Sequence, residues 1–66
     1  MKKVKFDIYF DDNYDVDLIE DICVLYDEAD LWYNDKRVRY FGSAERFDPF
    51  IKSVEIVGGI RKIVKY

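Results

Sequence analysis

Carboxylates are the side chains of this sequence whose spacing could support chemistry. Oxygen-bearing residues alternate at the start of one segment, as at the opening of a calcium-binding loop: Asp11, Asn13, Asp15 and Asp17. The rest of that motif is missing, because Val16 stands at the glycine position and Ile22 at the position of the closing glutamate. We therefore expect no metal site, and weak divalent-ion binding is the alternative.

Nucleophilic catalysis lacks a base in this sequence. There is no histidine, and Ser43, Ser53 and Cys23 are the only hydroxyl or thiol nucleophiles apart from tyrosine. Cys23 falls among apolar residues, which predicts a place in the core; a modifiable or oligomer-linking thiol is the alternative. A zinc site would need more cysteine and histidine than the chain contains. The sequence predicts a protein that is not an enzyme and binds no cofactor.

The charges are segregated along the chain. Between Phe6 and Asp35 stand eleven acids and no lysine or arginine, whereas the remaining residues hold all eleven bases and only three acids. The net charge of −3 is thus the difference between −11 in one segment and +8 in the rest. Such asymmetry suggests a charged partner.

Size and composition limit the architecture. Half of the 66 residues are apolar, which is enough for one small core, so we expect a single α+β domain over residues 1–66. No apolar run is long enough for a membrane helix, and the lysine-rich start leads into aspartates where an export signal would need apolar residues. We expect a cytoplasmic protein with no membrane partner.

The periodicity predicts the elements that must position the acids. Apolar and polar residues alternate from Val4 to Phe10, which indicates a strand over about 3–10. Apolar residues then recur at steps of three and four, and Asp15 and Asp17 suit a helix N-terminus, so we expect the main helix over about 15–28. A strand over 22–26 is the competing interpretation.

The second half of the chain predicts two hairpins. Strands over about 31–34 and 37–41 would place Arg37, Arg39 and Phe41 on one face. Asp48-Pro49 indicates a short helical turn near 44–53. Strands over about 54–57 and 60–65 would be joined by Gly58-Gly59 in a type I′ turn. The expected fold is a mostly antiparallel sheet of four or five strands packed by one main helix.

The acids of the expected helix and its flanking loops form the candidate site. Along this helix the carboxylates would fall about one per 3 Å, close to the roughly 3.4 Å per charge of a single nucleic-acid strand. Neighbouring aromatic residues would serve as anchors. The expected partner-binding residues are Asp11, Asp12, Asp15, Asp17, Glu20, Asp21, Asp27, Glu28, Asp30, Trp32, Tyr33 and Asp35.

These residues predict an inhibitor that acts by phosphate mimicry. A dense acidic face would occupy the basic groove of a nucleic-acid-binding protein or nuclease, without itself binding nucleic acid. Small phage-encoded inhibitors of nucleases, glycosylases and CRISPR effectors share this character, although no motif here matches a particular family. For a phage protein the compartment would be the host cytoplasm.

Three alternatives remain open from the residues alone. In the first, the acids and bases meet across the fold and leave a mixed surface. In the second, the chain is an interaction or homo-oligomerisation module, such as a homodimer, without mimicry. Bases also interleave with aromatic residues between Arg37 and Phe47, as on a sheet that binds single-stranded nucleic acid.

Overall fold

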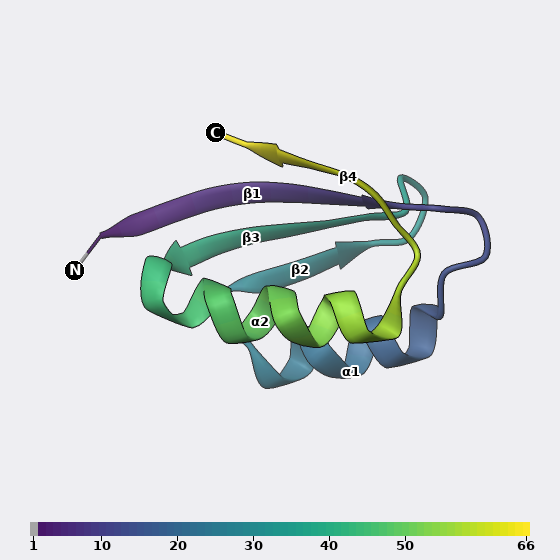
Figure 1. The fold of residues 1–66 in the computed structure, drawn as a ribbon, viewed down its shortest axis with the longest axis horizontal. Coiled ribbons are helices and arrows are strands. Elements are labelled where there is room, and N and C mark those ends of the chain that lie inside the picture. The colour runs from purple at the N-terminus through teal and green to yellow at the C-terminus, as the bar shows by residue number, and fades with distance from the viewer. Residues whose placement is uncertain (1) are drawn as a thin grey trace.

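A computed structural model describes residues 2–66 as a βαββαβ chain. The elements, labelled in Figure 1, are β1 (Lys3–Phe10), α1 (Val16–Leu25), β2 (Ala29–Trp32), β3 (Arg37–Ser43), α2 (Ala44–Val57) and β4 (Ile60–Lys65). The strands form one sheet in the order β2-β3-β1-β4, and every neighbouring pair is antiparallel. This is the split βαβ, or ferredoxin-like, arrangement.

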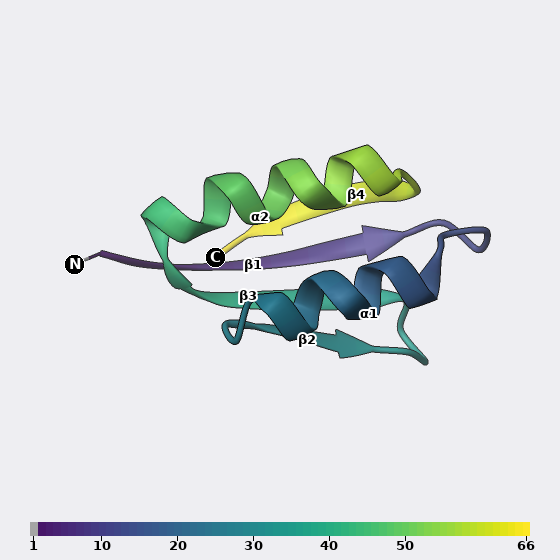
Figure 2. The ribbon, with the colours of Figure 1, turned by 90° about the horizontal axis from the view of Figure 1, so that it is seen from below.

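Both helices cover the same face of the sheet. Figure 2, seen from the helix side, shows α2 in front of β4 and α1 in front of β2 and β3. The side chains between the two layers are buried, and they include Ile8 from β1, Val38 and Tyr40 from β3, Ile19 from α1 and Phe50 from α2. Within residues 2–66 no helix covers the opposite face of the sheet, which we call the open face.

Alternation places the core as the sequence predicts. In β1, Ile8 and Phe10 face the helices, and in β3, Val38 and Tyr40 do so, whereas their neighbours face outward. Cys23 is buried on α1, which confirms its predicted place in the core. Burial raises the pKa of its thiol to about 11, and the charges of Asp30 and Glu20 add to this.

The second helix corrects the prediction for residues 44–57. The helical prediction near 44–53 is confirmed, but the helix is longer than expected. The strand over 54–57 is wrong, because α2 runs without a break from Ala44 to Val57. Ser43 is its N-cap and accepts a hydrogen bond from the Arg46 amide. Phe50 and Val54, four residues apart, are fully buried against the sheet, so burial outweighs the strand preference of the β-branched residues.

Gly58-Gly59 therefore connects α2 to β4 and does not form the predicted type I′ hairpin turn. Gly58 ends α2 by donating its amide hydrogen to the Val54 carbonyl, and Gly59 leads into β4, so there is no hairpin turn here. Both glycines have φ near +87°, a backbone that other residues rarely adopt. At Gly59 a Cβ atom would also lie 2.9 Å from Cβ of Tyr14.

The first helix is shorter than predicted. It ends at Leu25 rather than near residue 28, and Tyr26 accepts a turn-closing hydrogen bond from Ala29. As a result β2 spans Ala29–Trp32 instead of about 31–34. The alternative of a strand over 22–26 is wrong, because this segment lies mostly within α1. No helix in the described part of the chain combines the length and apolarity needed to cross a membrane.

Candidate functional site on the open face of the sheet

The predicted acidic residues separate into groups. Asp17, Glu20 and Asp21 are exposed on the outer side of α1, and three more acids precede them in the β1–α1 loop and at the helix N-cap, namely Asp11, Asp12 and Asp15. Asp27 and Glu28 lie at the other end of the helix, in the turn before β2. The helix carries three of these acids, so the predicted row of five does not form.

Part of the acidic charge is neutralised by bases from later in the chain. Lys36 pairs with Asp12 at 2.6 Å, Arg46 with Glu28 at 2.8 Å and Arg37 with Asp35 at 3.5 Å. The hydrogen bond from Lys36 lowers the pKa of Asp12. The three acids on α1, Asp17, Glu20 and Asp21, have no ion pair within residues 2–66. The charges therefore mix at the loops and stay separate on α1.

The two predicted aromatic anchors lie on different sides of the sheet. The Tyr33 hydroxyl donates a hydrogen bond to Glu20, so this ring accompanies the acids of α1. Trp32 lies on the open face, where the guanidinium of Arg37 stacks over its ring at 3.9 Å from the centroid. Asp30 is also on the open face, two residues before Trp32 along β2.

The open face gathers bases and aromatic rings from all four strands. Because residues paired across antiparallel strands share a face, the register places Lys5, Asp7 and Tyr9 of β1 beside Arg37, Arg39 and Phe41 of β3 and beside Lys62 of β4. Tyr66, which follows β4, joins them by pairing its backbone amide with the Lys5 carbonyl. The set spans sequence positions 5 to 66 and forms only when the strands are paired.

A buried carboxylate organises the centre of this face. Asp7 is 0% exposed and accepts two hydrogen bonds from Arg39, at 2.8 and 3.0 Å. It also accepts from the Tyr66 hydroxyl at 2.6 Å and from Arg37 at 3.4 Å. The hydrogen bonds from Arg39 lower the pKa of Asp7 to about 2, against the opposing effect of burial. In return, the hydrogen bond to Asp7 raises the pKa of Tyr66.

Three aromatic rings of the open face remain accessible. Trp32 is 42% exposed, Phe41 54% and Tyr66 60%. Cations lie close to each ring, with Lys5 at 5.0 Å from the centroid of Tyr66 and Lys3 at 5.6 Å from that of Phe41. Large exposed rings beside cations can stack against a flat ligand and bind its negative charges.

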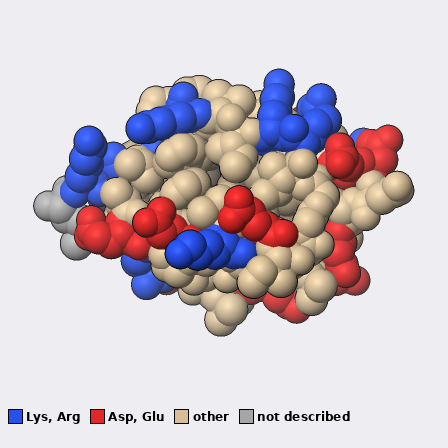
Figure 3. Space-filling view, viewed as in Figure 1, with Lys and Arg blue, Asp and Glu red and all other residues tan. Residues whose placement is uncertain are grey.

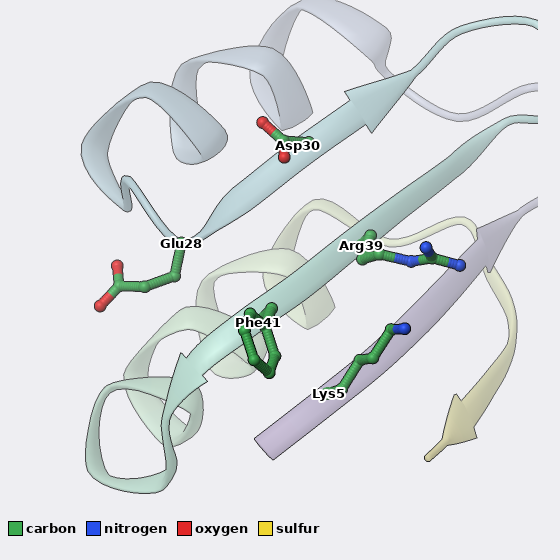
Figure 4. A pocket seen from close by; sticks show the side chains of 5 residues that line it. All are labelled: Lys5, Glu28, Asp30, Arg39 and Phe41. Atoms are coloured by element: carbon green, nitrogen blue, oxygen red, sulfur yellow. The ribbon is translucent and has the colours of Figure 1, made fainter. Parts of the chain in front are cut away.

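A pocket opens on this face at the β2 side. It has a volume of about 290 Å³ and is lined by Lys5, Glu28, Asp30, Arg39 and Phe41. Figure 4 shows Phe41 and the stem of Arg39 between Asp30 on one side and Lys5 on the other, while the guanidinium of Arg39 points toward β1. Glu28 points away from Asp30 (Figure 4), lies against Gly42 of β3 and pairs with Arg46 of α2.

The surface view agrees with partial separation of charge. Lysine and arginine side chains gather along the upper rim, where β1 and β4 lie in Figure 1, and acidic side chains form separate groups across the lower half and at the right-hand end (Figure 3). One basic side chain lies among the acids in the middle of this view (Figure 3). In this view the rim of the sheet is thus more basic than the surface around the helices (Figure 3).

The sequence reasoning did not single out four residues of this face. Lys5, Asp7 and Tyr9 belong to a strand interpreted only for its apolar face, and Tyr66 follows β4. The period-two pattern of β1 already placed Lys5, Asp7 and Tyr9 together on the face that is not apolar. Only the pairing of β1 with β3 and β4 shows that this face is shared and uncovered.

Within residues 2–66 there is no group of three or more Cys, Asp or Glu residues placed to hold a metal ion. Comparisons of the chain with protein-family models, with curated proteins and with solved structures found no match.

Proposed function

We propose that the protein binds single-stranded nucleic acid on the open face of the sheet. The observation that carries the proposal is the accessibility of Trp32 beside arginines, and of Phe41 and Tyr66 beside lysines, on a surface that no helix of the described residues covers. Bases stack on exposed aromatic rings, and lysines attract the phosphates between them. RNA-recognition domains use the open face of a four-stranded sheet in the same manner, an analogy of arrangement alone.

The net negative charge of the chain does not oppose this proposal, because most of the unpaired acids lie elsewhere. Asp17 and Asp21 are on α1, which packs on the opposite face of the sheet. Asp7 is buried and compensated by Arg39 and Arg37. The electrostatic potential that a nucleic-acid strand meets at the open face is set by the side chains on that face, among them Lys5 and Lys62.

Binding of a labelled oligonucleotide tests the proposal. We expect a thymidine oligonucleotide of about 12 residues to bind at low salt, with fluorescence anisotropy as the measurement, and Phe41→Ala to weaken binding about 10-fold through the loss of one stacked base. Tyr33→Ala is the matched control, because Tyr33 is 55% exposed, about the same as Phe41, but lies beside α1. Absence of binding, or equal effects of the two variants, would contradict the proposal.

The inhibitor function predicted from the sequence remains a second candidate. Its supporting observation is the outer side of α1, where Asp17 and Asp21 lie among exposed Leu18, Val24 and Leu25. Exposed apolar side chains among acids are typical of a surface that binds a basic protein. The double substitution Asp17→Lys and Asp21→Lys should abolish binding of a nucleic-acid-binding protein. The control Glu55→Lys, which changes the charge in the same direction on α2, should leave this binding intact.

A further inference from the structure

The pocket beside Phe41 has the polarity of a base-recognition site. Asp30 and Arg39 are directly paired across β2 and β3, yet Arg39 makes its ion pair with Asp7 on its other side. Asp30 has neither an ion pair nor a side-chain hydrogen bond to any described residue. Its two carboxylate oxygens are therefore acceptors without donors, at one side of a pocket of about 290 Å³.

The opposite side of the pocket supplies a donor. Lys5 lies across from Asp30, and the ring of Phe41 and the stem of Arg39 form the apolar surface between them (Figure 4). A planar ligand on this surface would need two features. It would present hydrogen-bond donors toward Asp30 and acceptors toward Lys5.

Guanine is the base whose edges match this polarity. Its N1–H and N2 amino group are adjacent donors that a carboxylate accepts together, and its O6 and N7 are acceptors on the other side of the ring. Cytosine and adenine offer a carboxylate one amino group, flanked by a ring nitrogen acceptor. Thymine and uracil offer one N–H between two carbonyl groups, and the oxygens of these carbonyl groups repel a carboxylate.

We propose that this pocket selects guanine in a single strand bound to the open face, a proposal that rests on the function proposed above. Phe41 stacks on the base, Asp30 accepts from its N1–H and N2 amino groups, and Lys5 donates to its O6 or N7. Phosphates stay away from Asp30 and lie nearer the lysines of β1 and β4. The other exposed rings, Trp32 and Tyr66, stack on neighbouring bases without selecting them.

Oligonucleotides that differ at one position test the selection. A thymidine oligonucleotide with one central guanine should bind about 10-fold more tightly than the all-thymidine strand, and central adenine or cytosine should give little gain. Asp30→Asn should abolish the guanine preference and leave binding of the all-thymidine strand intact or slightly stronger. Asp27→Asn is the matched control, because it removes the same charge from an exposed position outside the pocket.

The outcomes distinguish the two proposals. If the all-thymidine strand binds and central guanine gives no gain, or the gain survives in Asp30→Asn, guanine selection is wrong and the proposed function stands. If none of the strands binds, the proposed function fails. Comparing the DNA and RNA versions of each oligonucleotide shows which of the two nucleic acids the protein prefers. Binding of guanosine monophosphate as tight as that of the strand would overturn recognition within a strand.

Discussion

Asp7 carries its charge where water does not reach it, and three side chains compensate for this. Arg39 and Arg37 come from β3 and Tyr66 follows β4, so one carboxylate connects β1, β3 and the end of the chain across the open face. Removing one partner of a buried pair leaves the other charge uncompensated, which costs more than the pair itself contributes. The network also fixes the guanidinium of Arg37 over Trp32.

The acid limb of the stability curve should show this network. The folded pKa of Asp7, about 2, lies below its ordinary value of 3.8, so its contribution is complete above pH 4 and is lost as the pH falls toward 2. We expect a loss of about 2 kcal/mol over this range, measured by urea unfolding. Asp7→Asn should cost about 3 kcal/mol at pH 7 and flatten this part of the curve. If the free energy of unfolding fell equally below pH 4 in the unchanged protein and in Asp7→Asn, Asp7 would not contribute in this way.

At the scale of the element, α2 tolerates a proline in its interior. Pro49 is the sixth residue of the helix and is exposed, and it lacks the N–H that would donate to the Glu45 carbonyl. Burial of Phe50 and Val54 on the opposite side holds the helix together across this defect. The same Asp48-Pro49 pair is what made a helix start at this point the expected structure.

Replacing the proline should stabilise the protein. Pro49→Ala restores one hydrogen bond and removes a steric clash, so we expect a gain of about 2 kcal/mol, equivalent to a rise in Tm of roughly 10 °C for a chain of this size. Thermal unfolding followed by circular dichroism measures the change. Glu55→Ala, at another exposed position of α2, should change stability by less than about 0.5 kcal/mol. A destabilised Pro49→Ala protein would mean that the ring itself makes a stabilising contact.

For the whole molecule, the fold decides how the −11 and +8 segments meet. Ion pairs at Asp12, Glu28 and Asp35 join them at the loops, while among the described residues α1 keeps acids, and the sheet keeps lysines, that make no ion pair. The result is a small protein with a basic, aromatic sheet face and an acidic helix on the opposite side. Each of the two candidate functions uses one of these sides.

Salt dependence should identify the side that nucleic acid contacts. Lys62→Ala on the open face should lower the slope of log affinity against log salt by about 0.7, the value for one phosphate contact with a single strand. Lys52→Ala changes the net charge equally but lies on α2, and it should leave the slope unchanged. Anisotropy titrations over a range of salt concentrations measure both slopes. A larger effect at Lys52 would place the contact on the helix side.

The sequence by itself determined the strands with one apolar face, the placement of Arg37, Arg39 and Phe41 on a common face, and the segregation of charge, because each follows from residues close together in the chain. Tertiary structure decided the rest. Residues 54–57 are helical because Val54 is buried on the sheet, and the open face exists because β1 pairs with both β3 and β4 while both helices pack on one side. Local patterns show that a strand has two faces, but only long-range packing determines which face is left uncovered.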